Sequence, residues 1–490
     1  MPAEWGFPDA DPVINVAARP WERSDVVDSW RVSARLTEDA VVVIPGIMGT
    51  ELVDTATGKL LWGLQPGLLA RMWLTSKANL APLAVDPSRK STVRPARLLQ
   101  FPTLMPGLAG IEPYTKLVSS LRAAVRHPDA VLEFGYDWRL SVSTNADLLA
   151  HAIYEHIRWW RQRSDRPHAL VHLVAHSMGG LLCQALTTIS GAFDYVGLVI
   201  TLGAPFEGAA KAAVLLGTGS GAPVRASGLK PVAVTMPGIY DLLPTYRCVD
   251  EDIEVRRLTA ADVESIGGSK VLAEEALQHR DRARATPIPR HRAVIGVAQP
   301  TICTLTLHTT QVVEPHYYSF DVDDDGELLR DRHGIPRQFK GLGDGTVPRN
   351  SARPWHDKEP HPLPQQHGPI ARSDETIAYV LDRLLNRDTG PRLAGDGIGI
   401  RGPEIAEVGI EFEVEVTGDV ESPNDVRASV IETETDEQVT RPFAATRAGR
   451  IVVPVTVWQP GLYRIAVAGA GTTPVTQLVL VVSATAEHDR

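Results

Sequence analysis

The chain has little cysteine, no long apolar run and no excess of positive charge. Its three cysteines, Cys183, Cys248 and Cys303, are too few for a disulfide framework in 490 residues. No stretch reaches the roughly eighteen consecutive apolar residues that a membrane-spanning helix needs. The first thirty residues contain Asp, Glu, Arg and Pro and lack the apolar segment of a secretory signal. These absences predict a cytoplasmic protein without a membrane span.

The charge balance is acidic, with 59 Asp and Glu against 49 Lys and Arg and a net charge of −10. This balance argues against nucleic acid as a partner and gives no general attraction to anionic lipid. The share of apolar residues, 43%, is ordinary for a globular protein, and 490 residues leave room for more than one domain.

A candidate nucleophile lies in the sequence AHSMGG at residues 175–180. Mostly apolar residues precede it and an apolar helical segment follows, which is the strand–turn–helix context of a nucleophile elbow. Such a turn exposes the Ser177 hydroxyl and directs the Met178 N–H to the same space. Ser177 as a plain helix N-cap is the alternative, but a cap does not explain the small flanking residues. His176 is expected to point away from Ser177, because neighbours on a sharp turn diverge.

A second candidate element is the turn PGIMGT at residues 45–50, directly after the β-branched run at residues 40–44. A glycine-rich turn at the C-terminal end of a strand brings backbone N–H groups close to a ligand. We expect the Ile47 N–H to be the second oxyanion donor, with an ordinary strand-exit turn as the alternative.

The candidate acid and base follow in the chain order of α/β hydrolases, serine then acid then histidine. Asp344 lies in GDGTVP at residues 343–348, where the alternative is a simple Asp-Gly turn. His367 lies just before a predicted helix at residues 374–385, where this fold keeps its base. His361 is the alternative base.

The remaining elements of residues 39–387 predict a parallel α/β sheet. Strands are expected at residues 131–134, 172–175, 195–202 and 291–297, and an amphipathic helix at residues 144–162. Residues 212–245 break this pattern with GTGSGAP and are interpreted as a mobile lid or a plain surface loop.

Two further stretches have two interpretations each. Trp62 and Trp73 lie in a dense apolar segment that serves either the core or contact with a lipid surface. Asp321, Asp323 and Asp325 match the start of a calcium loop, but Arg332 stands where the twelfth-position acid belongs, which favours a polar hairpin turn. No metal or other cofactor is predicted.

The C-terminal part changes periodicity after a Gly/Pro-rich linker at residues 388–403. Apolar residues alternate with polar ones from residue 410, and short strands follow at residues 427–432, 451–458, 462–468 and 477–482. This spacing predicts an all-β sandwich at residues 404–490, and we expect it to dock on the first domain or on a protein partner.

With these pieces in place, the chain resembles the lecithin:cholesterol acyltransferase family, which includes lysosomal phospholipase A and its bacterial and plant relatives. The resemblance covers about residues 40–387, and these segments carry it in the family's order: VVVIPGIMGTEL, KLLWG, FGYDWRLS, LVAHSMGGLL, TLGAPFEGAAKA, MPGIYDLLP, GDGTVP and a histidine before the last helix. Ala175 departs from the usual elbow glycine, and residues 51–110 lack the cap disulfide of secreted relatives.

The resemblance implies an α/β-hydrolase fold with a cap at about residues 51–110 and a lid at about residues 212–245, preceded by an N-terminal arm at residues 1–38. It implies that Ser177 is the nucleophile, Asp344 the acid and His367 the base. Met178 and Ile47 would form the oxyanion hole. The cap around Trp62 would contact lipid, with peripheral membrane contact as its consequence.

We therefore expect a serine lipase, phospholipase or acyltransferase that acts on lipid acyl esters. An esterase for soluble or polymeric esters and a catalytically idle binding module are the alternatives.

Overall fold

The computed structural model describes most of the chain. The described residues are 36–63, 80–88, 91–99, 114–219, 226–308, 313–323, 327–353, 360–386, 397–418, 420–433, 435, 437–469 and 474–483. Nearly all of the predicted N-terminal arm, Trp73, Asp325 and most of the predicted linker lie outside these residues.

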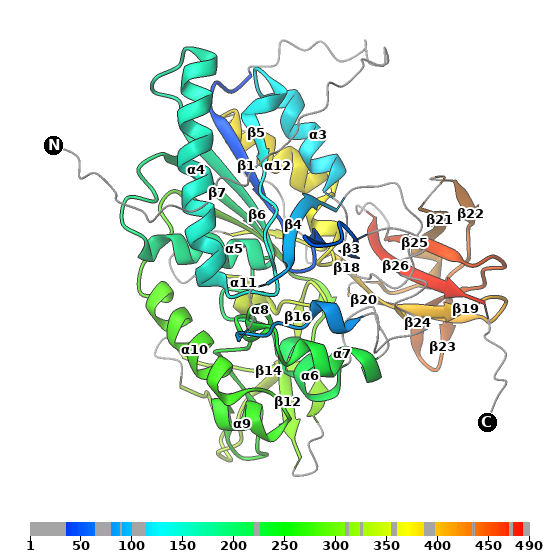
Figure 1. Ribbon diagram of the computed structural model, residues 1–490. Helices are drawn as coiled ribbons and strands as arrows, with labels where there is room; N and C mark the ends of the chain where they lie inside the picture. The colour runs from blue at the N-terminus through cyan, green and yellow to red at the C-terminus, as the bar shows by residue number, and fades with distance from the viewer. Residues whose placement is uncertain are drawn as a thin grey trace. The chain divides into compact units, whose positions relative to one another are not determined.

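A parallel sheet with the order β17–β10–β7–β6–β1–β5 is the centre of the first part of the chain (Figure 1). Every neighbouring pair runs parallel. Its strands are Ala40–Ile44 (β1), Val131–Glu133 (β5), Val171–His176 (β6), Val196–Leu202 (β7), His291–Gly296 (β10) and His361–Leu363 (β17). β1 is apolar and buried at every position because helices cover both faces of the sheet. The predicted α/β sheet is therefore confirmed.

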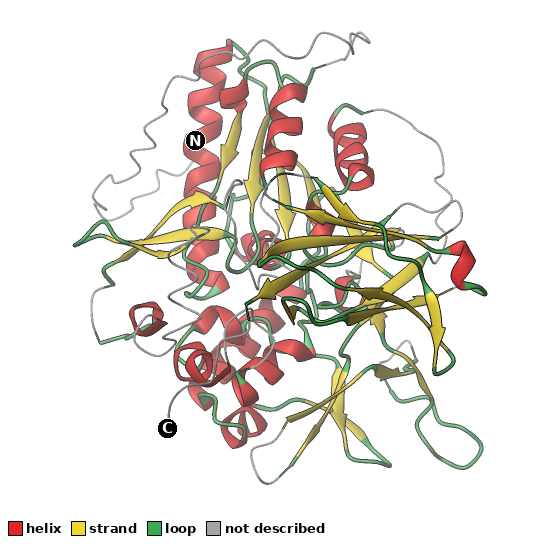
Figure 2. Ribbon diagram, turned by 90° about the vertical axis from the view of Figure 1, so that its right-hand side faces the viewer, coloured by secondary structure: helices red, strands yellow, loops and turns green. Residues whose placement is uncertain are grey.

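Helices cover the two faces of the sheet (Figures 1 and 2). α4 (Val142–Ser164) packs against β1 and α5 (Met178–Ala185), whereas α3 (Thr115–Ala124) packs against β5 and α12 (Asp374–Leu384). Ser373 caps α12, because its hydroxyl accepts a hydrogen bond from the Thr376 N–H. Leu148 of α4 is 53% exposed and does not belong to the buried face of this helix.

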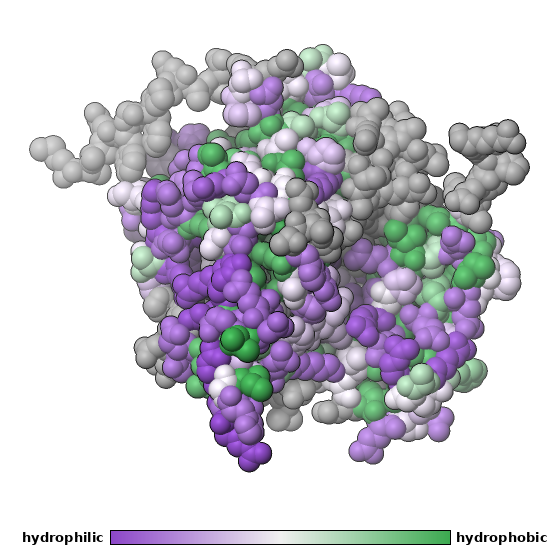
Figure 3. Space-filling view, turned by 90° about the horizontal axis from the view of Figure 1, so that it is seen from below, coloured by the Kyte–Doolittle hydropathy of each residue, from purple (hydrophilic) through white to green (hydrophobic). Residues whose placement is uncertain are grey.

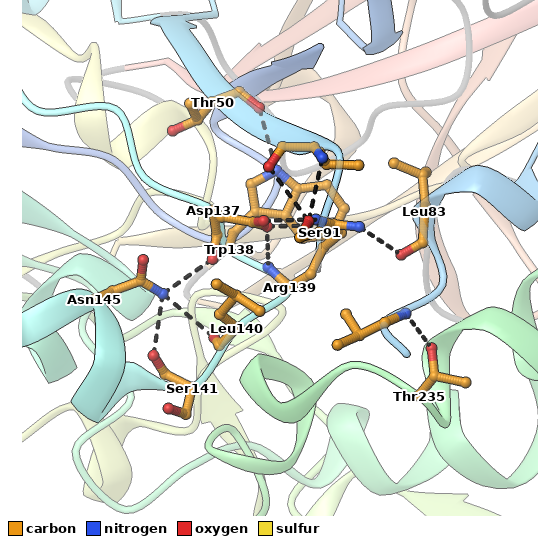
Figure 4. Close-up of polar contacts among 12 residues, drawn as sticks. Thr50, Leu83, Ser91, Asp137, Trp138, Arg139, Leu140, Ser141, Asn145 and Thr235 are labelled. Atoms are coloured by element: carbon orange, nitrogen blue, oxygen red, sulfur yellow. Dashed lines mark hydrogen bonds and ion pairs between the residues drawn. The ribbon is translucent and has the colours of Figure 1, made fainter. Parts of the chain in front are cut away.

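The predicted cap begins with a small antiparallel sheet. Its order is β3–β2–β4, formed by Leu60–Trp62, Thr50–Asp54 and Val93–Leu98, with a 3-10 turn at Ala81–Leu83 (η1). A buried ion pair lies beneath it (Figure 4). The Arg139 guanidinium donates two hydrogen bonds to the Asp137 carboxylate, at 2.8 and 2.6 Å, and one to the Leu83 carbonyl at 3.2 Å. Both side chains of this ion pair are buried.

The segment predicted as an irregular lid is largely helical where it is described. α6 (Ala210–Thr218), α7 (Ala226–Ala233) and α8 (Pro237–Tyr240) occupy it. Leu216, Ala233 and Tyr240 are fully buried in the main core, so these helices are packed elements. The sequence signal was weak because small residues such as Gly and Ala suit a tight helix contact as well as a loop. A lid function for residues 212–245 stays a prediction.

Between residues 247 and 352 the chain forms short elements around the end of the central sheet. The strands are Arg247–Asp250 (β8), Val255–Arg257 (β9), Gln299–Pro300 (β11), Thr304–Leu307 (β12), Val313–His316 (β13), Tyr318–Phe320 (β14), Gln338–Lys340 (β15) and Leu342–Gly343 (β16). The helices are Ala260–Ser265 (α9), Lys270–Arg284 (α10) and Arg349–Ala352 (α11). β11 pairs with β16, which places Asp344 at the end of β16 beside the central sheet.

The C-terminal strands form two sheets around a second apolar core, which confirms the predicted all-β sandwich. One sheet is β18 (Ile398–Arg401), β20 (Phe412–Gly418), β24 (Arg450–Val455) and β23 (Ala445–Arg447). The other is β19 (Ile405–Glu407), β26 (Val475–Val482), β25 (Gly461–Ala468), β21 (Arg427–Glu432) and β22 (Gln438–Thr440). β18 lies inside the segment predicted as a linker. The division of the chain into domains stays a prediction.

The face shown in Figure 3 is mainly hydrophilic, with hydrophobic residues in small groups. Phe443 and Trp458 of the C-terminal part are 89% and 75% exposed. Among the described helices, none combines the length and the hydrophobicity that crossing a bilayer would require.

Candidate active site

Ser177 lies on a sharp turn between β6 and α5. Its backbone has φ +52° and ψ −126°, a conformation that a residue with a side chain rarely adopts. The small residues around it are needed for packing: a Cβ on Gly179 would lie 2.7 Å from the carbonyl oxygens of Ile44 and Pro45. The strand, the strained serine and the helix together form the geometry predicted for a nucleophile elbow.

The structure brings Ser177, His367 and Asp344 into one hydrogen-bonded chain. His367 Nε2 lies 2.8 Å from Ser177 Oγ, and His367 Nδ1 lies 2.7 Å from Asp344 Oδ2. All three side chains are more than nine-tenths buried. His361, the alternative base, lies in β17 and stacks on Tyr379 with ring centroids 4.3 Å apart.

The Asp344 carboxylate is held by the turn that follows it. Its Oδ1 accepts hydrogen bonds from the N–H groups of Thr346 and Val347, at 2.9 and 2.6 Å. This leaves Oδ2 directed at His367 Nδ1. The Asp344 backbone carbonyl also accepts from the His367 N–H at 2.9 Å. Backbone N–H groups therefore fix the Asp344 carboxylate, and the contact with its Oδ2 sets the position and the tautomer of the His367 imidazole.

Gly203, at the end of β7, makes room for the pair of Asp344 and His367. It has φ +58°, and a Cβ there would lie 3.0 Å from Asp344 Oδ2 and 3.4 Å from His367 Nδ1. Reasoning from the sequence missed this role. The available signal was the glycine that directly follows the buried strand, next to the site edge of the sheet.

The turn after β1 lies against the serine. A Cβ on Gly46 would lie 2.8 Å from Ser177 Cβ, so the backbones of the two turns are in close contact. Ile47 is the next residue, and Met178 is the first residue of α5. Among the described residues, no acceptor is found for the N–H of Ile47 or of Met178. Their assignment as oxyanion donors stays a prediction.

His176 connects the turn after β1 to the base. Its Nε2 lies 2.9 Å from the His367 carbonyl oxygen, and its Nδ1 lies 2.8 Å from the Tyr114 hydroxyl. The Tyr114 oxygen also accepts from the Gly46 N–H at 2.8 Å. Neither ring nitrogen contacts Ser177, as predicted.

The protonation of this chain follows from its partners. Burial, together with the nearby His367 ring, lowers the pKa of His176 to about 3, so the ring is neutral at pH 7. Because a carbonyl only accepts, Nε2 carries the proton and Nδ1 accepts from the Tyr114 O–H. Burial raises the pKa of Tyr114, which keeps that hydroxyl protonated. The Gly46 N–H, the Tyr114 hydroxyl, both His176 ring nitrogens and the His367 carbonyl therefore all have partners. Nothing in the local sequence marked Tyr114.

The other predicted site residues lie elsewhere or outside the described residues. Trp62 is 3% exposed, and its indole N–H donates to the Met48 carbonyl at 2.7 Å. It is a core residue here and not a surface contact for lipid, since its one polar group is used inside the fold. Asp323 Oδ1 accepts from the Glu327 N–H at 2.9 Å, as in a polar turn, and Asp321 pairs with Arg337. Among the described residues, no cluster of potential metal ligands is found.

A cavity of about 630 Å³ lies between α4, α5 and α10. Its lining includes Leu181, Phe206 and Arg280, and it includes none of the three residues of the hydrogen-bonded chain. The candidate site is therefore located by the chain of polar contacts and not by this cavity.

The family model for lecithin:cholesterol acyltransferase matches residues 103–266, a segment that contains the elbow. Over this segment, which is about a third of the chain, the sequence is similar to that family. The match supports an acyl-ester hydrolase or acyltransferase, and it confirms the resemblance drawn from the motifs. Asp344 and His367 lie outside the matched segment.

Similar proteins were also found among curated sequences and solved structures. An uncharacterized protein of Saccharomyces cerevisiae, YJR098C, is 27% identical over 169 residues, which are 33% of this chain and 23% of the yeast protein. The chain thus aligns with about a quarter of that relative. The lipase BlEst2 of Bacillus licheniformis in its mature form is 13% identical over 71% of this chain and 91% of that chain, with a TM-score of 0.33. The propeptide form of that lipase is 12% identical over 90% of this chain and 93% of that chain, also with a TM-score of 0.33. A TM-score this low supports no statement about activity.

Proposed function

We propose that this protein cleaves acyl esters of lipids through an acyl-serine intermediate on Ser177. The observation that carries the proposal is the chain from Ser177 Oγ through the His367 ring to the Asp344 carboxylate, with contacts of 2.8 and 2.7 Å. This arrangement matches the roles of nucleophile, base and orienting acid. The match to the acyltransferase family supports the choice of acyl esters.

In the first half of the reaction, Ser177 Oγ bonds to the ester carbonyl carbon while His367 Nε2 takes the hydroxyl proton. The N–H groups of Met178 and Ile47 stabilise the negative charge on the carbonyl oxygen. The bond from carbon to the leaving oxygen then breaks, and His367 Nε2 returns the proton to that oxygen. Asp344 holds the Nδ1 proton and stabilises the charged ring throughout.

In the second half, His367 Nε2 takes a proton from an acceptor, whose oxygen bonds to the acyl carbon. The bond from that carbon to Ser177 Oγ breaks, and His367 Nε2 returns the proton to Oγ. Water gives a fatty acid, as in a lipase or phospholipase, and an alcohol gives a new ester, as in an acyltransferase. Both outcomes use the same residues in the same roles.

The test is fatty-acid release from phospholipid vesicles, with and without a long-chain alcohol. We expect release by the wild type, none by Ser177→Ala, and unchanged release by Ser119→Ala, which changes an exposed serine on α3. An acyl-alcohol product would identify an acyltransferase. Activity confined to soluble short-chain esters would contradict the lipid substrate, and a wild type that no serine-directed probe labels would contradict the enzyme itself.

A further inference from the structure

The loop that carries His367 is hydrogen-bonded to the C-terminal β-sandwich. Gln365 and Gln366 directly precede the base. The Gln365 amide donates to the Pro474 carbonyl at 3.0 Å, just before β26. The Gln366 amide donates to the Ile400 carbonyl of β18 at 3.3 Å. Two successive side chains of the loop are thus anchored on both sheets of the sandwich.

Gln477 of β26 forms the other half of this anchor. Its Oε1 accepts from the Gly402 N–H at 3.0 Å, and its Nε2 donates to the Gly402 carbonyl at 2.9 Å. The same Oε1 lies 3.4 Å from Gln366 Nε2. Gln477 is 5% exposed. Both the donor and the acceptor of this buried amide are hydrogen-bonded. The Gln477 side chain therefore keeps one conformation, because a buried polar group without a partner lowers the stability of the fold.

Gln299 connects β18 to the segment that carries Asp344. Its side chain accepts from the Ile400 N–H at 2.8 Å and donates to the Pro364 carbonyl at 2.7 Å, three residues before His367. Its backbone lies in β11, which pairs with Gly343 and forms a bridge to Asp344. Gln299 is fully buried. Gln299 therefore connects the loop of His367 and β18 through its side chain and the segment of Asp344 through its backbone.

We infer that the β-sandwich is a positioning element of the active site, which fixes the loop of His367 through Gln366 and Gln477. The inference rests on the proposed function, since it assigns these residues to the placement of the base. The sandwich would act on catalysis without contacting substrate. A displacement of about 1 Å at a catalytic group lowers rates by about 100-fold, so a loosened loop has a large effect.

The experiment measures the rate at which a fluorophosphonate labels Ser177 in the full chain, because this reaction needs the base but not the natural substrate. We expect Gln366→Ala to lower the maximal labelling rate by about tenfold or more, with unchanged probe affinity and melting temperature. Gln477→Ala is expected to act similarly, and the double variant to lose less than the two single losses combined, because both single variants remove the contact between Gln366 and Gln477. Gln438→Ala is the matched control, since this exposed glutamine of the sandwich pairs only with Arg441 among the described residues.

Equal labelling rates for the wild type and Gln366→Ala would overturn the inference. Gln366 is partly exposed, so this variant carries the test if the buried Gln477→Ala fails to fold. Hydrogen exchange at the His367 amide, which is bonded to the Asp344 carbonyl, gives a second readout that does not require activity. Faster exchange in Gln366→Ala supports the inference, and unchanged exchange overturns it. A wild type that is never labelled contradicts the proposed function alone.

Discussion

The neutral, buried ring of His176 makes a sharp prediction about the stability of the fold in acid. Burial and the His367 ring lower the pKa of this group to about 3 in the folded state. In the unfolded chain it returns to the ordinary value of about 6.5. Between these values the unfolded state binds a proton and the folded state does not. Stability contributed by the neutral ring is therefore complete above about pH 6.5 and is lost as the pH falls.

The size of the effect follows from the two pKa values. Each pH unit within the window costs about 1.4 kcal/mol of unfolding free energy. Between pH 6 and pH 4 the wild type should lose about 2 to 3 kcal/mol more than a variant without a titrating group at this position. His176→Gln is that variant, because an amide has no charge to gain.

The measurement is urea unfolding followed by circular dichroism at pH 7, 6, 5 and 4. Only the dependence on pH matters, since His176→Gln has its own baseline stability. His168→Gln, a change at an exposed histidine, is the control and should keep the wild-type dependence. If the wild type and His176→Gln lose stability in parallel between pH 6 and pH 4, the assignment of a neutral buried ring is wrong.

Three further changes test the packing of the site. Tyr114→Phe leaves the Gly46 N–H and a buried imidazole nitrogen without partners, so the unfolding free energy should fall by about 2 kcal/mol in urea; no change would show that water replaces the hydroxyl. Gly203→Ala places a methyl group 3.0 Å from Asp344 Oδ2 at a positive φ, so fluorophosphonate labelling should slow and stability fall by about 1 kcal/mol, whereas full labelling speed would contradict the close fit. Arg139→Leu leaves a buried carboxylate unpaired and should cost about 3 to 5 kcal/mol, and a thermal melt within about 2 °C of the wild type would argue against the ion pair.

Much of the fold and site was predictable because local signals agreed with the tertiary structure. The run at residues 40–44 is buried on both faces and has the β-branched composition of a central parallel strand. The elbow was recognisable because a strained serine needs small neighbours within the same short stretch. Asp344 and His367 followed from chain order, and the structure places His367 against Ser177 and Asp344 against His367.

The features that sequence reasoning missed depend on contacts between distant segments. Tyr114 and His176 are 62 residues apart, and no local pattern links them. Ile410 fits the alternation of its strand yet is 59% exposed, because the strand begins only at Phe412. The helices α6, α7 and α8 could not be recognised from the sequence, because their small residues pack against other parts of the chain.

Chemical modification of the three buried cysteine thiols reports local unfolding of the protein. Cys183 on α5, Cys248 in β8 and Cys303 ahead of β12 are each at most 1% exposed. Burial raises the pKa of Cys248 and Cys303 to about 12 and raises that of Cys183 further. Only a thiolate reacts with alkylating reagents, so the folded chain is inert to them. Each cysteine becomes reactive when its own region opens, and the order of modification therefore maps how the fold comes apart.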